Sequence, residues 1–519
     1  MTVDEPSHFA AGYMYWLGED VLIPADTPPL TRIVGGWVPR ILGAPDPRQS
    51  KYWASRDAYM IGHTILGNVD KRGRRLLFYS RLPFILFPIG IVSLIWYWGR
   101  QLFSERTALI LAICCALEPT ILGHGVLIKS DVPAAFSALL FAYAAWSYWR
   151  IPTVRRLLFM TAAVLIAVLT KFTLLPLFFI GYALALWRGP RLLAGFVMPL
   201  AIYAGILAAG QFQAQPMPPD TVRAIAGERI PEWLLSAAVI PAKLPWPTQF
   251  VEGVSYITRS LHGDGFTGYM LGKKIHGWTP MYFPLAWAVK FPIPLQLLAI
   301  AGLAGFLIRV CKRQARAAEV FISGAAVLFF GLAVSSNFHI GFRHVLPALP
   351  FLILGGGSIA ERCVSSLPGR AVIALGMTWL AISSVSVFPQ DLAYFNEWIG
   401  GPKNGWKYLA DSNVDWGQNY PELADYLKRN DIKEVRSFLF SFDNPWHYMP
   451  EGSLAPQPWP SAATPSGQRY HPEPGIYAIS ANILTGLLMP AGQEDYLAEF
   501  RSRTPDAYAG YSILIYTVK

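Results

Sequence analysis

Ten apolar runs occupy most of the chain between residues 82 and 388, and short polar segments, many of them basic, separate several of them. The runs are Leu82–Trp98, Thr107–Leu122, Val132–Trp149, Leu157–Thr170, Phe172–Trp187, Leu192–Phe212, Pro292–Val310, Val320–Ser335, His344–Ile359 and Ala371–Phe388. A transmembrane helix needs about 20 mostly apolar residues. Because several runs are shorter, we expect some partial, tilted or broken helices. The pattern predicts a mainly α, polytopic membrane helix bundle of about ten spans.

The two ends of the chain lack such runs. Before residue 81, Trp37-Val38-Pro39 and Tyr52–Leu66 are typical of short amphipathic pieces at a membrane interface. After Pro389, charged residues return between short regular stretches, which are the strands Val435–Phe442, Gly475–Ser480 and Tyr511–Val518 and the helix Pro421–Arg429. We therefore expect three parts: an outer-face loop with interfacial helices and an acidic motif (1–80), a transmembrane bundle with a long outer loop at 213–290 (81–389), and a soluble, extracytoplasmic α/β domain (390–519).

Composition agrees with a membrane protein. Of 519 residues, 53% are hydrophobic and 14% aromatic, which is too apolar for an ordinary soluble enzyme. The net charge of +10 could indicate nucleic-acid binding, but the basic residues lie mostly in short clusters between apolar runs. We therefore expect membrane lipid, and no nucleic acid, as a partner. All four cysteines lie in or beside apolar runs without metal-ligand spacing, so we predict free thiols.

The basic clusters set the orientation. They lie at alternate span ends and comprise Arg100, Arg106, Arg150, Arg155, Arg156, Arg188, Arg191, Lys312, Arg313, Arg316, Arg362 and Arg370. The positive-inside rule makes that side cytoplasmic in a multi-pass plasma (inner) membrane protein. The N-terminal stretch, the 213–290 loop and the C-terminal domain then lie on the outer, periplasmic side. The basic run Lys71-Arg72-Gly73-Arg74-Arg75 breaks the rule, and anionic headgroups nearby would explain it.

An outer N-terminus at Met1 has neither a signal peptide nor a preceding span to carry it across. We expect a natural form with one further helix upstream, which would make eleven spans, or a misassigned start.

Candidate chemistry collects on the outer side. Asp4-Glu5-Pro6-Ser7-His8 is by itself typical of a solvated tail or a helix start. Further on, Asp131 is either a helix cap or a functional acid, and these readings are compatible. Lys171 and Lys290 either snorkel to the interface or bind an anion. The outer face also holds His8, His339, Arg343, His344, Asp411 and Asp415, whereas His124 reads as a structural imidazole.

In their order, these segments resemble the GT-C class of integral membrane glycosyltransferases, specifically the bacterial type of the protein O-mannosyltransferase clan (glycosyltransferase family 39). The matching segments are Asp4-Glu5-Pro6-Ser7-His8, Pro28-Pro29-Leu30, Leu117-Glu118-Pro119 through His124 to Asp131, Leu169-Thr170-Lys171-Phe172-Thr173, Lys290-Phe291-Pro292, Gly341-Phe342-Arg343-His344-Val345-Leu346-Pro347 and Asp411-Ser412-Asn413-Val414-Asp415-Trp416-Gly417-Gln418. Two features depart from the family: its first span is missing, and Thr27 stands where relatives often have His.

The resemblance implies transfer of a sugar from a polyprenyl-phosphate donor to an acceptor hydroxyl of a protein, lipid or glycan. It implies Asp4 as the base, Glu5 as its support and Asp131 as a positioning acid. Cations must stabilise the leaving phosphate. Arg343 suits this role by its forked donors, and Lys171, Lys290 and His344 are further candidates. Direct attack predicts inversion at the anomeric carbon, and Asp4 must then lie beside Asp131 and Arg343.

Three alternatives stay open at this point. Asp4 and His8 share a helix face and could bind a divalent metal, but two ligands do not define a site. In the last motif, Asp415, Trp416 and Gln418 contact the acceptor or sugar, or they belong to a Gly turn before Pro421. The class of protein also stays open, because a transporter or lipid flippase would use Asp131 and Lys171 for an ion or headgroup, and a non-catalytic binding or scaffold protein can keep the same fold.

Overall fold

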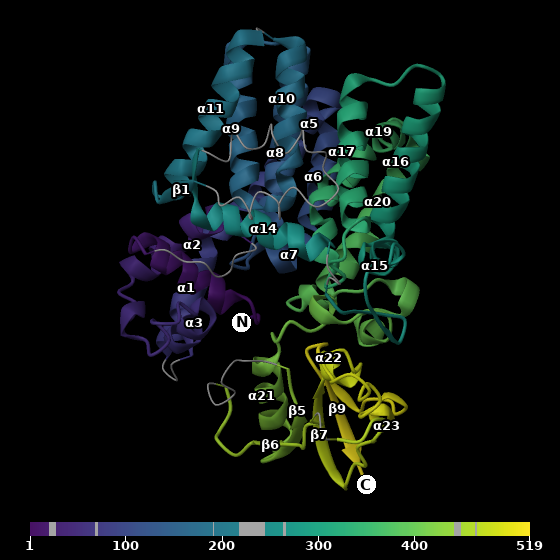
Figure 1. Ribbon diagram of the computed structural model, residues 1–519. Helices are drawn as coiled ribbons and strands as arrows, with labels where there is room; N and C mark the ends of the chain where they lie inside the picture. Colours follow the sequence, from purple (N-terminus) through teal and green to yellow (C-terminus); the bar gives the residue numbers. More distant parts are fainter. Residues whose placement is uncertain are drawn as a thin grey trace.

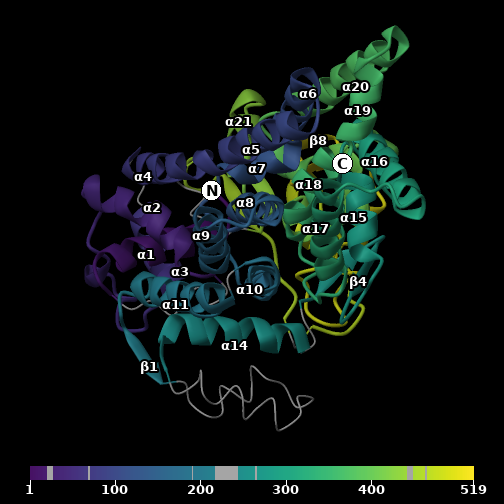
Figure 2. The same cartoon turned by 90° about the horizontal axis from the view of Figure 1, so that it is seen from above.

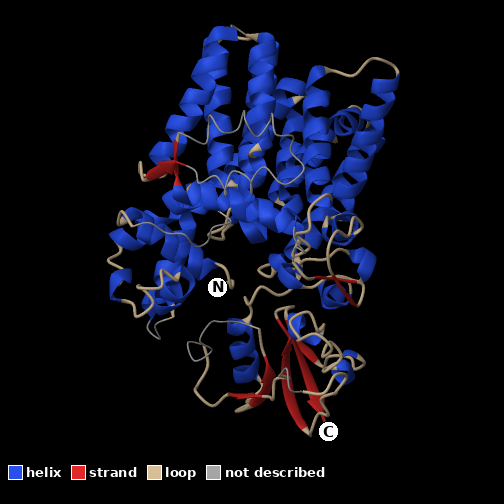
Figure 3. Cartoon of the chain, viewed as in Figure 1, coloured by secondary structure: helices blue, strands red, loops and turns tan. Residues whose placement is uncertain are grey.

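The computed structural model describes residues 1–19, 27–67, 71–189, 191–216, 244–262, 266–440, 448–461 and 464–519. Helices dominate as far as residue 385, and the largest sheet lies near the C-terminus (Figure 3). The predicted fold class, a mainly α helix bundle with a C-terminal α/β region, is confirmed.

Four helices precede the bundle: α1 (Glu5–Trp16), α2 (Leu30–Ile41), α3 (Ala58–Leu66) and α4 (Lys71–Arg81), with a 3₁₀ turn η1 (Pro47–Gln49) between α2 and α3. Helix α1 begins where Glu5 and Pro6 favour a first turn, and its residues 5–14 are all buried. The acidic motif is therefore the start of a buried helix, and a solvated tail is excluded.

Glycines allow the neighbours of α1 to approach its backbone. A Cβ atom on Gly36 of α2 would lie 1.9 Å from the carbonyl oxygen of Gly12, and one on Gly62 of α3 would lie 2.0 Å from that of Pro6. Figure 2 shows α1–α4 along one side of the bundle, away from α16, α19 and α20. The contacts fix the position of the N-terminal segment against its neighbours.

The first half of the bundle comprises η2 (Leu82–Ile85), α5 (Leu86–Leu102), α6 (Glu105–Ala116), α7 (Pro119–Gly125), α8 (Asp131–Arg150), α9 (Val154–Thr170), η3 (Phe172–Leu174), α10 (Pro176–Arg188) and α11 (Arg191–Ala209). The predicted first span lies within a continuous helix of 31 residues, Arg72–Leu102. The second predicted span is bent by 59° between α6 and α7, where Pro119 follows Glu118.

A mixed segment and the second half of the bundle follow. The mixed segment comprises β1 (Ala214–Pro216), β2 (Pro245–Pro247), α14 (Thr248–His262), β3 (Gly268–Met270), β4 (Lys273–Ile275) and α15 (Tyr282–Lys290). The second half comprises α16 (Ile293–Cys311), α17 (Ala317–Val334), η4 (Phe342–Ala348), α18 (Leu349–Gly355), α19 (Gly357–Val364) and α20 (Leu367–Val385). Residues 217–243 and 263–265 of the predicted outer loop lie outside the described residues.

Within the described residues, five helices are long and apolar enough to cross a membrane, or six if the bent pair α6–α7 is one span. Shorter apolar helices occupy Phe172–Arg188 and Ala194–Ala209. The chain is an integral membrane protein, and the count of about ten spans stays a prediction.

The basic connections lie together at one end of the bundle. Arg188 after α10 donates to the carbonyl oxygen of Trp149 at the end of α8, 2.8 Å away. Near α16, Arg309 donates to Ser358 of α19, and Glu361 of α19 accepts from Ser104 before α6. Figure 1 shows the α10–α11 and α16–α17 connections at the top and the C-terminal region at the bottom. The connections that hold most of the predicted cytoplasmic arginines therefore lie at the end of the bundle opposite the C-terminal region, and the side of the membrane that each end faces stays a prediction.

The C-terminal region begins with the 3₁₀ turns η5 (Asp391–Ala393), η6 (Glu397–Ile399), η7 (Pro402–Lys407) and η8 (Asp411–Asn413). It continues with α21 (Tyr420–Arg429), β5 (Val435–Phe438), β6 (Leu454–Pro456), β7 (Gly475–Ser480), α22 (Ala481–Leu484), α23 (Ala498–Arg501), β8 (Ala507–Ala509) and β9 (Ile513–Val518). The sheet order is β6-β5-β7-β9-β8, parallel among β6, β5 and β7 and antiparallel beyond. The strands begin or end close to where the sequence predicts them; the end of the predicted Val435–Phe442 run reaches residues 441–442, outside the described residues.

Candidate functional site

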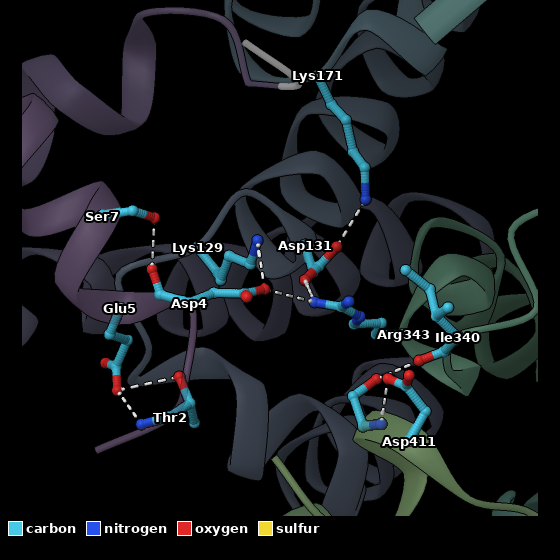
Figure 4. Close-up of polar contacts among 11 residues, drawn as sticks. Thr2, Asp4, Glu5, Ser7, Lys129, Asp131, Lys171, Ile340, Arg343 and Asp411 are labelled. Atoms are coloured by element: carbon cyan, nitrogen blue, oxygen red, sulfur yellow. Dashed lines mark hydrogen bonds and ion pairs between the residues drawn. The ribbon is translucent and has the colours of Figure 1, made fainter. Parts of the chain in front are cut away.

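Asp4 lies directly before α1, between two cations. Lys129 Nζ is 2.9 Å from Asp4 Oδ2, and Arg343 Nη1 is 3.6 Å from the same oxygen (Figure 4). The Asp4 side chain keeps 34% of its surface exposed, whereas Lys129 and Arg343 keep 9% and 7%. Asp4 is therefore the accessible member of this group, and its two counter-ions are buried.

Asp131, the first residue of α8, forms the second half of the site. Lys171 Nζ is 2.6 Å from Asp131 Oδ1, and Arg343 Nη1 is 3.8 Å from Asp131 Oδ2. Arg343 thus joins two carboxylates. We call these five residues, Asp4, Lys129, Asp131, Lys171 and Arg343, the charge cluster. The structure brings Asp4, Asp131 and Arg343 together, as the sequence leads us to expect.

The ends of α8 and α9 place Asp131 and Lys171. The N-cap of α8 is Ser130, whose side chain makes no cap bond. Asp131 follows it in the first turn, and its carboxylate is directed at Lys171. Lys171 follows α9 in an extended conformation, with φ −154° and ψ 131°. Its ammonium group forms an ion pair instead of snorkelling to the interface. The positive end of the α8 dipole adds to the attraction for anions here.

The turn before η4 places Arg343. Gly341 has φ 155°, and a Cβ atom there would lie 2.3 Å from Ser412 Oγ. Only glycine therefore allows this close approach. The backbone N–H of Phe342 donates to Asn413 Oδ1 at 2.9 Å. The Arg343 guanidinium carbon lies 4.1 Å from the centroid of the Trp416 ring, so the 411–418 loop supports the arginine by a cation–π contact.

Glu5 points away from the charge cluster and is fully paired. Arg81 of α4 donates to it through Nε at 2.7 Å and Nη2 at 2.5 Å, and Thr2 donates its backbone N–H at 2.9 Å. The backbone N–H of Ile128 also donates to it, at 3.4 Å. Burial raises the pKa of Glu5, but Arg81 outweighs this and lowers that pKa to about 2. Glu5 therefore holds the N-terminal turn beside the segment that carries Lys129.

Within the 411–418 loop, the side chains of Asp415 and Gln418 close a turn, and Asn482 of α22 donates to the Asp415 backbone from outside it. Asp415 Oδ1 accepts from the backbone N–H of Gly417 at 3.1 Å, and Gln418 bonds to the backbone of Trp416 and Val414. Gly417 has φ 76°, which fits the turn reading of the motif. Burial raises the pKa of Asp415 to about 7. Within this motif, the Trp416 ring is the part that contacts the charge cluster.

The two remaining predicted phosphate ligands lie elsewhere or at the edge. Lys290 is buried and donates to the carbonyl oxygens of Leu392 and Asn413, so the structure does not bring it into the charge cluster. His344 neighbours Arg343 in η4, and its ring stacks on Phe338 at 5.8 Å. Its Nε2 atom is buried without a hydrogen-bond partner among the described residues.

The charges around Asp4 control its acidity. Burial by itself raises the pKa of the carboxyl group, but Lys129 and Arg343 outweigh it, with a smaller contribution from His8. The pKa of Asp4 is therefore held well below its usual value. At neutral pH the group is ionised, as a proton acceptor must be, but it is a weak base while both cations remain on it.

Lys129 is the one member of the charge cluster that the sequence analysis misses. It stands between the predicted runs Thr107–Leu122 and Val132–Trp149, two residues before Asp131, on the side already assigned to the candidate acids. A lysine between two predicted spans, so close to a candidate acid, is the sequence feature that could have identified it.

No group of three or more His, Cys, Asp or Glu side chains lies close enough to hold a metal ion in the part of the chain that the structure describes. Among the described residues, Asp4 and His8 therefore have no third ligand of these types beside them.

A family model described as dolichyl-phosphate-mannose-protein mannosyltransferase matches residues 74–210. No curated protein matches the chain. Among solved structures, ArnT from Cupriavidus metallidurans in the apo state is 12% identical and has a TM-score of 0.44, covering 99% of this chain and 93% of that one. The same protein bound to undecaprenyl phosphate is 14% identical with a TM-score of 0.42 and the same coverage.

The oligosaccharyltransferase AglB from Archaeoglobus fulgidus, in complex with an inhibitory peptide and a dolichol-phosphate, is 12% identical with a TM-score of 0.46. The match covers 95% of this chain and 67% of the AglB chain. All three TM-scores lie below 0.5. The family match includes three members of the charge cluster, Lys129, Asp131 and Lys171. Over residues 74–210 the chain resembles the dolichyl-phosphate-mannose-protein mannosyltransferases, and the resemblance indicated by its motifs is confirmed.

Proposed function

We propose that the protein is a membrane glycosyltransferase that moves a sugar from a polyprenyl-phosphate donor to an acceptor hydroxyl on the non-cytoplasmic face. The observation that carries the proposal is the accessible carboxylate of Asp4 beside Arg343, within a cluster of buried cations. The family match supports the class of enzyme. The basic connections at the opposite end of the bundle support the side of the membrane.

Each charge has a part in the reaction. The acceptor oxygen attacks the anomeric carbon from the face opposite the phosphate and forms the new C–O bond. The old bond breaks, and its electron pair stays on the phosphate oxygen. The hydroxyl proton passes to the Asp4 carboxylate, which returns it to water. The products are an inverted glycoside and polyprenyl phosphate.

Arg343 and Lys171 stabilise the charge that develops on the leaving phosphate, because both are positive and face the same region. Asp131 keeps both cations in place. Its side chain is only 4% exposed and is engaged by Lys171, so it is less suited than Asp4 to meet an acceptor. Glu5 acts through its bonds to the N-terminal turn.

The test is Asp4→Asn, which keeps the size of the side chain and removes the base. With polyprenyl-phosphate mannose as the labelled probe, we expect transfer to fall by about 10²–10⁴-fold. Binding of polyprenyl monophosphate should persist, because the cations are unchanged. If the protein were a transporter or a non-catalytic protein, the wild type itself would transfer no sugar.

The matched control is Asp46→Asn, which removes the carboxylate that pairs with exposed Arg48 in the same N-terminal region. It should leave transfer and binding unchanged. If Asp4→Asn transferred sugar at the wild-type rate, Asp4 would not be the base.

A further inference from the structure

Lys129 has a place in the charge cluster that the proposed reaction has not yet used. Its ammonium group and the guanidinium group of Arg343 both reach one oxygen, Asp4 Oδ2, at 2.9 and 3.6 Å. Both also lie over the Trp416 ring, at 5.9 and 4.1 Å from its centroid. Asp4 Oδ2 therefore occupies the position of an anionic oxygen between two buried cations.

Counted over its own five residues, with the nearby Asp411 left outside the group, the charge cluster carries a net positive charge. The charge cluster holds three cations, Lys129, Lys171 and Arg343, against the two carboxylates Asp4 and Asp131. One further negative charge would make the five residues and their ligand neutral. A phosphodiester with one ionised oxygen supplies that charge, and buried cations bind such a group by short, charge-assisted hydrogen bonds.

The segment that carries Lys129 is fixed. Ile128 donates its backbone N–H to Glu5, and Lys129 donates its own backbone N–H to the carbonyl oxygen of Leu127 at 2.8 Å. Between this anchored backbone and its ammonium group, Lys129 has a four-carbon stem whose rotations can carry the ammonium group from one anionic oxygen to another nearby. Asp4 is the partner it would leave.

Resting on the proposed function, we infer that Lys129 is a further ligand of the donor phosphate, and that it leaves Asp4 for the phosphate when the donor binds. Lys129 and Arg343 then stabilise the leaving group, and Asp4 loses the counter-ion that weakens it as a base. Donor binding thus prepares Asp4 to accept the proton of the acceptor hydroxyl. A hydroxyl that arrives without a donor meets an Asp4 that is still paired.

The competing explanation is that Lys129 only holds Asp4 in place. The dissociation constant of polyprenyl monophosphate distinguishes a phosphate ligand from a residue that only holds Asp4. It is measured for the full-length wild type and for Asp4→Asn, Lys129→Gln and the double variant. A phosphate ligand acts directly, so Lys129→Gln should weaken binding about tenfold in both backgrounds. Asp4→Asn should tighten binding severalfold when Lys129 is present, because the carboxylate no longer competes for it.

A lysine that acts only through Asp4 has no effect once Asp4 is neutral. If the double variant bound polyprenyl monophosphate as tightly as Asp4→Asn alone, the inference would be overturned. Lys129→Arg should recover most of the lost affinity. Lys407→Gln, which changes an exposed lysine of η7, should bind as the wild type does.

The uncharged polyprenol is the control for folding. Its binding should be equal in all variants, because it contacts no phosphate ligand. These measurements require no transfer. A chain that binds the phosphate through Lys129 but transfers nothing would disprove the proposed reaction, whereas loss of transfer in Asp4→Asn without any effect of Lys129→Gln would disprove the inference alone.

Discussion

Asp411 is a further carboxylate close to the charge cluster, and its surroundings are unfavourable for its charge. It adopts a left-handed conformation with φ 57°, and its Oδ1 accepts from the backbone N–H of Ser412 at 2.6 Å. Burial raises its pKa to about 6 and Asp4 adds to the rise, while Arg343 opposes it. Ionisation of this residue therefore costs stability in the folded protein.

The sign of this effect gives a pH-dependent prediction. The folded pKa of about 6 exceeds the unfolded value of 3.8, so the folded state binds more protons between these values. Stability is therefore lost as pH rises from about 4 to about 6. Asp411→Asn keeps the acceptor oxygen and tolerates φ above zero. We expect it to stabilise the protein by about 1–3 kcal/mol above pH 6 and to be neutral near pH 4.

The measurement is the unfolding temperature of both proteins in detergent across this pH range. A constant difference between the variant and the wild type at all pH values would contradict the assignment, because the benefit must appear only as the native carboxyl ionises.

Sequence reasoning located single residues when their side of the membrane followed from topology. Asp4, Asp131, Lys171 and Arg343 were identified in this way, because the outer ends of spans converge. Which of their neighbours complete the group depends on side-chain paths that no spacing rule gives. Lys129 was missed for this reason, and Lys290, equally well placed by topology, instead binds backbone carbonyl oxygens.

At the scale of elements, α1 directly follows the proposed base and depends on close helix contacts. The contact between Gly36 and Gly12 leaves no space for a side chain, and Gly62 meets Pro6 two residues after Asp4. The sequence predicted amphipathic pieces in this region but not a helix that is buried over residues 5–14. A 12-residue helix with a polar first turn has neither the length of a span nor one apolar face.

We expect Gly36→Ala to destabilise the protein by about 1–3 kcal/mol, because the added methyl group must push α2 away from α1. Transfer should fall as well, since Asp4 would shift relative to Lys129 and Arg343. The comparison is Gly376→Ala in α20, where no atom lies within 4 Å of the added carbon. Unfolding temperature and transfer rate measure both effects, and equal behaviour of the two variants would show that the contact is not tight.

At the scale of the molecule, the described basic connections and the charge cluster belong to opposite ends of the bundle. Hydrophobic runs were sufficient to predict this arrangement, because length and charge asymmetry decide it. They could not predict the bend between α6 and α7 or the helix that extends back to Arg72. The bend depends on a proline after a buried Glu118, and the extension depends on the packing of α4 against α2 and α3.

Orientation can be tested with a thiol that the chain already has. Cys311 is free and exposed at the basic end, whereas Lys407 is exposed in η7 near the C-terminal sheet. A membrane-impermeant maleimide should label Lys407→Cys in intact cells, tested in a Cys311→Ser background. Cys311 should react only after the cells are opened. Labelling of Cys311 in intact cells would reverse the proposed orientation.

The 411–418 loop also determines when, during synthesis, the segment beside Asp4 can make its contacts. Trp416 supports Arg343, and its carbonyl oxygen accepts the backbone N–H of Val3 at 2.9 Å, so the segment beside Asp4 is tied to a residue made hundreds of positions later. During translation, the bundle helices are threaded into the bilayer well before this loop leaves the ribosome. A premature stop codon upstream of the loop therefore yields an inserted protein without the contacts of Trp416 to Val3 and Arg343, so the charge cluster gains this support only near the end of synthesis.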